Sequence, residues 1–206
     1  MADVTFPLLS VSRLRMSIDG AGVTTLIAGA GCPLSCRWCI NKRLLREKAP
    51  EYVSPQTLYE KVKPDNLYFL ATGGGVTFGG GESLLYAPFL AQFRRIIPPE
   101  WKLNVETSLN VARELVEIAA QTADFFIVDI KDADPEVYRS YTGQDNARVF
   151  ENLAYLVDRV GEKRVRVRVP LIPEYNTPEN QQNTVNCLKI MGISQIETFP
   201  YVIKEA

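Results

Sequence analysis

Short apolar runs, most of them rich in β-branched residues, alternate with longer amphipathic runs from Val23 to the end of the chain. This alternation constrains the fold more than any other feature, because it is typical of parallel strands joined by crossover helices. The predicted strands are 23–28, 76–78, 102–106, 124–130, 164–169 and 195–199. The sequence therefore predicts an α/β fold: an open partial barrel of the TIM type with six βα units and parallel strands, with the N-terminal segment added at its edge.

Capping residues and prolines set the predicted helices. Ser54 and Asp134 each precede a proline and Thr177 precedes Pro178, which is the pattern of a helix N-terminus. Pro64 is expected to end the first helix, and Asn110 is expected to cap the third. The predicted helices are 55–63, 83–97, 110–120, one beginning at 135, 147–160 and 178–191. At 206 residues and 46% hydrophobic composition, the chain is expected to form a single domain over residues 1–206.

Charge and hydropathy exclude several classes of protein. The net charge of −1 provides no global basic field, which argues against a general nucleic-acid binder. No segment approaches the roughly 20 apolar residues that a membrane-spanning helix needs, and the N-terminus lacks the apolar run of a secretory signal. We therefore expect a soluble, cytoplasmic protein whose thiols are reduced.

Three cysteines follow the first predicted strand: Cys32, Cys36 and Cys39, in GCPLSCRWCIN. Thiolates are soft ligands that select iron–sulfur clusters, zinc or copper. A four-iron cluster held by three cysteines keeps one iron open for a substrate or cofactor. A structural zinc site wants four ligands, and without any histidine only the distant Cys187 could supply the fourth. Cys187 itself reads as a buried core thiol on the last helix.

Six glycines surround the short second strand in GGGVTFGGGE, residues 73–82. Glycine permits close backbone approach, so the second run could press the main chain against a small ligand. Glu82 just beyond it would accept hydrogen bonds from a cationic amine. The alternative is a flexible turn in which Glu82 caps a helix N-terminus. The pattern lacks the Gly-Lys-Ser/Thr ending of a phosphate-binding loop.

Taken together, the motifs resemble those of the radical S-adenosylmethionine enzymes and, more narrowly, the pyruvate formate-lyase activating enzymes and the wider glycyl-radical-enzyme activases. The resemblance runs in order from about Asp19 to Tyr201 and so covers nearly the whole chain. Its motifs are DGAG at 19–22, GCPLSCRWCIN, GGGVTFGGGESLL, ETSLN at 106–110, DIKD at 129–132, and Arg168 with Pro173.

The resemblance implies a set of site residues. Cys32, Cys36 and Cys39 would hold a 4Fe–4S cluster whose fourth iron binds the amino and carboxylate groups of S-adenosylmethionine. The other implied contacts are Trp38 near the adenine, Gly80, Gly81 and Glu82 at the methionyl amine, Asp129 and Lys131 along the cofactor, and Arg168 at its carboxylate. Glu106, Thr107 and Asp129 match positions where these activases hold a monovalent cation.

The resemblance also implies an activity. An external one-electron donor, flavodoxin-like or ferredoxin-like, would reduce the cluster, and reductive cleavage of S-adenosylmethionine would give a 5'-deoxyadenosyl radical. That radical would abstract hydrogen from a glycine Cα of a partner glycyl-radical enzyme. Two alternatives stay open: radical modification of a peptide, nucleoside or small metabolite, and a non-catalytic cluster-binding or electron-transfer protein.

Some residues also have a purely structural interpretation, and the chain departs from the family in places. Asp129 and Lys131 could form an ion pair at a strand end. Arg168 alternates with valines and is therefore expected to line the barrel interior, where it needs an anionic partner. The activases commonly carry a histidine after the last Pro-Tyr pair, whereas Tyr201 is followed by Val202. Family members also usually continue for a further segment, whereas this sequence ends at Ala206.

Overall fold

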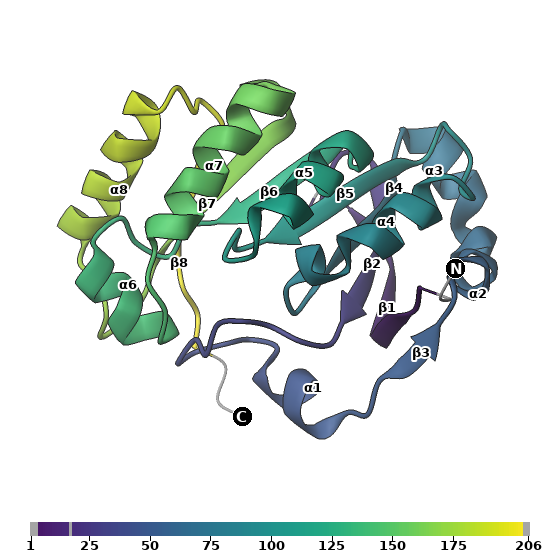
Figure 1. Cartoon of the computed structure of the whole chain (residues 1–206), viewed down its shortest axis with the longest axis horizontal. Coiled ribbons are helices and arrows are strands. Elements are labelled where there is room, and N and C mark those ends of the chain that lie inside the picture. The colour runs from purple at the N-terminus through teal and green to yellow at the C-terminus, as the bar shows by residue number, and fades with distance from the viewer. Residues whose placement is uncertain (1–3, 17, 204–206) are drawn as a thin grey trace.

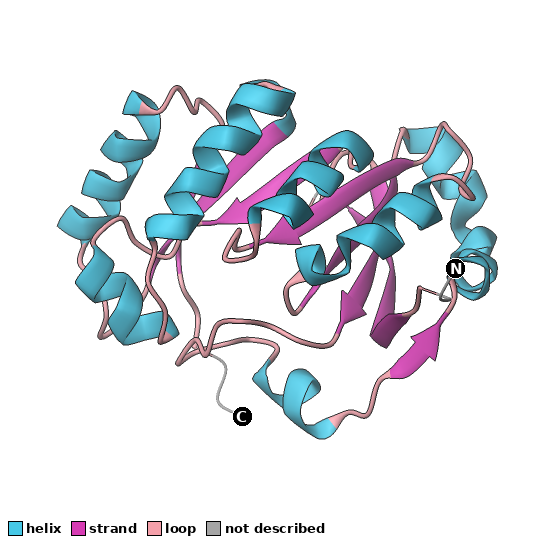
Figure 2. Ribbon diagram, viewed as in Figure 1, coloured by secondary structure: helices cyan, strands magenta, loops and turns pink. Residues whose placement is uncertain are grey.

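The computed structural model describes residues 4–16 and 18–203, and one eight-stranded sheet forms its centre (Figures 1 and 2). The strand order is β3-β1-β2-β4-β5-β6-β7-β8, and the six strands from β2 to β8 in this order are all parallel. Their bounds are β2 Val23–Gly29, β4 Gly75–Gly80, β5 Lys102–Thr107, β6 Phe125–Asp129, β7 Val165–Leu171 and β8 Ile196–Pro200. All six predicted strands are therefore confirmed, as is the open partial barrel.

The remaining two strands extend the sheet at one edge. β1 (Phe6–Met16) pairs antiparallel with β2, which confirms the predicted N-terminal addition. β3 (Glu51–Val53), which was not predicted, pairs with the other side of β1. Within the described residues the sheet does not close between β3 and β8. The barrel therefore keeps an open side.

The helices are α1 Lys42–Glu47, α2 Pro55–Val62, α3 Asn66–Thr72, α4 Ala87–Arg94, α5 Arg113–Thr122, α6 Pro135–Thr142, α7 Ala147–Val160 and α8 Pro178–Ile190. The side chains of Ser54, Asp134 and Thr177 accept backbone N–H groups at the starts of α2, α6 and α8, as predicted. Among the described residues, no helix is both long and apolar enough to traverse a bilayer.

Two of the predicted helices have wrong boundaries. Asn110 does not cap α5, which begins after Ala112, because the Asn110 side chain instead donates to the Asp145 carbonyl. The predicted end of the first helix is confirmed, since α2 ends at Val62, just before Pro64. A 3-10 turn at Lys63–Asp65 then leads directly into α3. The predicted helix 83–97 is a 3-10 turn, Ser83–Tyr86, followed by the shorter α4.

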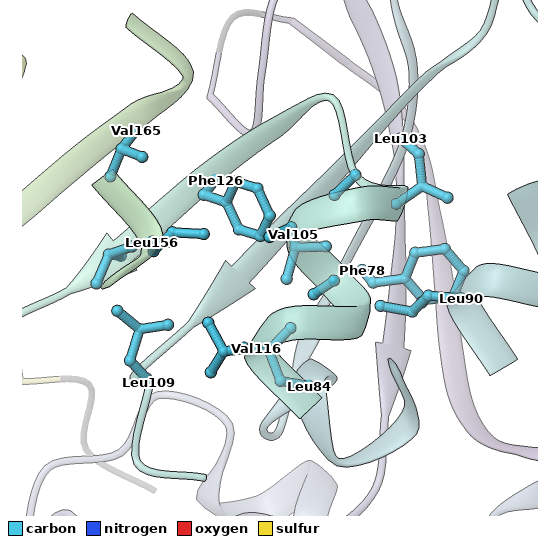
Figure 3. Close-up of a cluster of buried hydrophobic side chains, with 14 of the residues drawn as sticks. Phe78, Leu84, Leu90, Leu103, Val105, Leu109, Val116, Phe126, Leu156 and Val165 are labelled. Atoms are coloured by element: carbon cyan, nitrogen blue, oxygen red, sulfur yellow. The ribbon is translucent and has the colours of Figure 1, made fainter. Parts of the chain in front are cut away.

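The strands separate an apolar face from a polar one. Phe78, Val105, Phe126 and Val165 pack against helix residues in one buried cluster (Figure 3), whose labelled helix partners include Leu90, Val116 and Leu156. Burying each such side chain contributes about 1.5–3 kcal/mol. Successive side chains alternate between faces, so the intervening residues of β5, β6 and β7 point into the barrel. These include Asn104, Glu106, Asp129, Arg166 and Arg168.

Candidate functional site

The loop carrying the three cysteines, residues 30–41, begins at the carboxyl end of β2 and lies across the mouth of the barrel (Figure 1). On one side, the N–H groups of Ser35 and Arg37 donate to α6 carbonyls, with Ser35 reaching the Thr142 oxygen at 2.8 Å. On the other side, the Asn41 side chain donates to the Gly80 carbonyl at 2.8 Å. The sequence prediction placed this loop beyond a strand's carboxyl end, which is where parallel α/β folds carry their sites.

The three thiols are free and face a cavity of about 360 Å³. Cys32 is exposed, whereas Cys36 and Cys39 are partly buried. Burial raises the pKa of Cys36 to about 11, against the opposing effect of Lys131, and burial also raises the pKa of Cys32. Because thiolates are the metal-binding form, metal binding here would release protons.

The donors on this loop fit an iron–sulfur cluster. Within the part of the chain that the structure describes, no three His, Cys, Asp or Glu side chains converge as a single metal ion requires. A cluster makes a different demand, because each thiolate binds its own iron. The Trp38 indole N–H, between two of the cysteines, is buried without a hydrogen-bond partner among the described residues. Such an orphaned donor fits a site that takes a further polar group.

Arg168 is the centre of a charged network inside the barrel. Its Nε donates to Asp129 at 2.8 Å and its Nη1 donates to Glu106 at 3.0 Å, with a longer contact of 3.3 Å from Nη2 to Asp129. The expected anionic partner of Arg168 is thus present within the chain. A guanidinium has five N–H donors, so two remain after these three contacts. Although burial alone would lower it, the pKa of Arg168 is raised by the two carboxylates.

Asp129 also pairs with Lys131, at 3.3 Å. Burial would raise the pKa of Asp129, but Lys131 and Arg168 outweigh it and lower the pKa below its ordinary value. The strand-end ion pair foreseen from the sequence therefore exists. For the predicted cation site, Glu106 and Asp129 have a guanidinium between them and Thr107 donates to Glu82, so that site stays a prediction.

Glu82 is buried, and each of its oxygens accepts two hydrogen bonds from the protein. Oε1 accepts from the Thr107 hydroxyl at 2.6 Å and the Leu84 N–H at 3.1 Å. Oε2 accepts from the N–H and hydroxyl of Ser108, at 2.8 and 2.6 Å. Burial raises the pKa of Glu82, and these bonds oppose the rise. The capping interpretation of Glu82 is confirmed by the Leu84 contact, and its contact with an amine stays a prediction.

The second glycine run approaches the main chain of the cysteine loop closely, whereas its predicted contact with a small ligand stays a prediction. Gly81 and Glu82 donate their N–H groups to the Gly29 and Gly31 carbonyls at 3.0 and 2.8 Å. A Cβ at position 81 would lie 2.0 Å from the Gly31 oxygen, so only glycine fits there. This contact joins the end of β4 to the start of the cysteine loop.

Several contacts were not predicted from the sequence. The Tyr201 hydroxyl donates to the Trp38 carbonyl and thereby ties the segment after β8 to the cysteine loop. Ser108 supplies two of the four bonds to Glu82. The Pro-Tyr and ETSLN motifs contain these residues, but no periodicity pointed to their partners. Cys187, expected in the core, is only partly buried on α8.

Comparison with known proteins agrees with this geometry. Residues 26–181 match the radical SAM superfamily, so the chain belongs to that superfamily and is an enzyme of radical chemistry. It is 30% identical over 190 residues to the pyruvate formate-lyase-activating enzyme of Clostridium pasteurianum, covering 89% of this chain and 77% of the relative. It is also 26% identical, over an alignment of 245 positions, to the isethionate sulfite-lyase activating enzyme of Oleidesulfovibrio alaskensis. That alignment covers 89% of this chain and 79% of the relative.

A solved structure supports the fold. Streptococcus suis SuiB superposes with a TM-score of 0.66 at 15% identity, over 88% of this chain and 42% of that one. At this identity the likeness concerns the partial barrel alone. The curated relatives, by contrast, are activating enzymes of different lyases, and the family as a whole implies S-adenosylmethionine and a 4Fe–4S cluster.

Proposed function

We propose that this chain activates a partner glycyl-radical enzyme by abstracting hydrogen from a glycine Cα. The observation that carries the proposal is the loop of three free thiols fixed across the carboxyl ends of the parallel strands. When bound there, a 4Fe–4S cluster with S-adenosylmethionine supplies a 5'-deoxyadenosyl radical. The relatives are activating enzymes of lyases, which supports a partner enzyme as the target, and the family resemblance implies a glycine as the site of abstraction.

The residues of the chain would bind and orient the cofactor. Cys32, Cys36 and Cys39 would each bind one iron. The two N–H groups of Arg168 that remain free suit the carboxylate of the methionyl group. Asp129 and Glu106 hold Arg168 in place, and Lys131 pairs with Asp129. The orphaned indole N–H lies on the thiol loop. The remaining contacts, at Gly80, Gly81, Glu82 and Thr107, are those implied by the family resemblance.

A basic face beside the thiols suits an acidic electron donor. Arg37, Lys42 and Arg46 line the same cavity as the cysteines, and none of them forms a salt bridge with a described residue. A flavodoxin-like or ferredoxin-like carrier with an acidic surface would dock there and be steered by charge. Replacing Lys42 and Arg46 with glutamate should slow reduction by such a carrier but not by dithionite, measured by the loss of cluster absorbance.

The direct test is cofactor cleavage without oxygen. The reconstituted chain, given dithionite and S-adenosylmethionine, should yield 5'-deoxyadenosine and methionine. The variant Cys36→Ser should yield neither, whereas Cys187→Ser, which alters the cysteine outside the loop, should match the wild type. Absence of both products from the wild type would contradict the radical chemistry at this site.

A second measurement tests the partner. A candidate glycyl-radical protein mixed with the reduced, cofactor-loaded chain should develop the doublet electron paramagnetic resonance signal of a glycyl radical. Cleavage of the cofactor without any such signal, but with modification of a peptide or metabolite, would replace the activase by the other radical reaction. The two measurements separate failure of the chemistry from a wrong partner.

A further inference from the structure

A second cavity, of about 430 Å³, lies at the opposite end of the barrel from the thiols. Its lining comes from the amino ends of the strands: Lys102 and Phe125 are the first residues of β5 and β6, and Arg166 is the second residue of β7. The cysteine loop follows a carboxyl end, so the two sites are separated by the length of the strands. The volume falls within the roughly 300–1,000 Å³ of small-molecule sites.

The charges in this cavity are strongly unbalanced. Three cations, Lys102, Arg164 and Arg166, line it with one carboxylate, Asp124. That carboxylate is already engaged, because it accepts the Leu103 N–H at 2.9 Å and lies 3.5 Å from Arg94. The lining therefore carries an excess of positive charge with no acidic group left to balance it.

The three cations differ in what holds them. Arg164 donates to the Ala123 and Asp124 carbonyls, so a structural role explains its position. Arg166 lies over the Phe125 ring, 5.5 Å from its centroid, and makes no hydrogen bond or salt bridge with a described residue. Lys102 likewise has no ion-pair partner among the described residues and is exposed at the rim. Two donors thus face the cavity with their charge available.

We propose that this cavity binds a small phosphate-bearing anion. Arg166 would contact two phosphate oxygens through its planar fork, and Lys102 would add a point charge. A phosphate dianion balances both cations, whereas a single carboxylate would leave one of them unpaired. The Phe125 ring and the remaining volume leave room for an organic substituent, so either inorganic phosphate or a phosphate monoester fits the chemistry.

Calorimetric titration of the full chain, with and without reconstituted cluster, tests the proposal independently of the proposed function. The probes are inorganic phosphate and ribose 5-phosphate, with ribose as the uncharged control. Neither phosphate probe contains adenine, so they do not report on an S-adenosylmethionine site. We expect saturable binding with a dissociation constant below about 1 mM for at least one phosphate probe and none for ribose. Tighter binding of ribose 5-phosphate than of phosphate identifies a monoester as the ligand, and equal binding identifies the free anion.

Variants locate the binding. Arg166→Gln and Lys102→Gln should each weaken it at least ~10-fold. Lys189→Gln, which removes an exposed cation from α8, should bind like the wild type. Because Lys102 is exposed, its variant retains the fold even if the Arg166 variant does not. Failure of both phosphate probes to bind the wild type, or undiminished binding by Lys102→Gln, would overturn the proposal.

Discussion

Replacing Arg168 with methionine should destabilise the protein chiefly by leaving Glu106 without a cation. The Arg168 and Glu106 side chains are only 19% and 18% exposed, and Asp129 still keeps Lys131 when the guanidinium is removed. Removing one partner of a buried ion pair costs about 3–5 kcal/mol, and partial exposure favours the lower end of that range. At a urea dependence of about 2 kcal/mol per molar, a loss of ~3 kcal/mol lowers the unfolding midpoint by ~1.5 M.

The pH dependence identifies the cause of the loss. Burial raises the pKa of Glu106 above its ordinary value even with Arg168 opposing it, so without Arg168 the pKa rises further. A carboxyl group whose pKa is higher in the folded than in the unfolded state binds more protons when folded. Its contribution to stability is therefore lost as pH rises through the folded-state pKa. The deficit of Arg168→Met should accordingly be smaller near pH 5 than near pH 7.5.

Two further variants test whether the unpaired Glu106 causes the loss of stability. Adding Glu106→Gln to Arg168→Met should recover part of the lost free energy of unfolding, because no buried charge then lacks a partner. Arg166→Met is the matched control on the same strand face, and it should cost less than about 1 kcal/mol because its arginine has no carboxylate partner among the described residues. Circular dichroism of the metal-free chain in urea measures all of these. An equal deficit at both pH values, with no recovery in the double variant, would refute the reasoning.

Three other perturbations have distinct expected outcomes. Glu82→Gln should lower stability by about 2–3 kcal/mol in thermal unfolding, because an amide N–H would face the two Ser108 donors; an unchanged midpoint would contradict this. Tyr201→Phe removes the donor to the Trp38 carbonyl, so it should lower the free energy of unfolding by about 1 kcal/mol and make a chelator remove the cluster faster, measured by its absorbance. An unchanged rate of cluster loss would show that Tyr201 does not hold the cysteine loop. Gly75→Ala would place a Cβ 2.1 Å from the Lys102 carbonyl oxygen and should prevent folding. Gly79→Ala would place a Cβ 2.5 Å from a Glu106 carboxylate oxygen and 2.9 Å from Leu26, side-chain atoms that can shift where backbone cannot, so this variant should express as folded protein of lower stability.

The strands were predictable because their signal is local. In β7, Val165, Val167 and Val169 alternate with arginines, and that pattern alone separates a core face from an interior face. Short elements carry no such signal: α1 has six residues and no side-chain cap, and β3 has three. Their positions depend on pairing with β1 and on the course of the cysteine loop, which are long-range contacts.

In the candidate site, too, some features were predictable from the sequence and others were not. The three thiols and Arg168 were predictable as residues that need partners, because soft donors and an inward-facing guanidinium imply them. Which partner each one takes was not predictable. Glu82 was assigned to an amine or to a helix cap, yet most of its hydrogen bonds come from Thr107 and Ser108, on the neighbouring β5 and the turn after it. Sequence spacing does not show which neighbouring strand end will supply those donors.

Because the thiol-bearing segment is attached on one side to Gly80 and on the other to Thr142, it bridges the two rims of the opening. Because the loop is bonded at both ends, its length must adjust when the distance between the two rims changes. Any bulky polypeptide that spreads the rims must also pull on the segment that carries the sulfur anchors. A change in the width of the opening would therefore change the spacing of the three thiols.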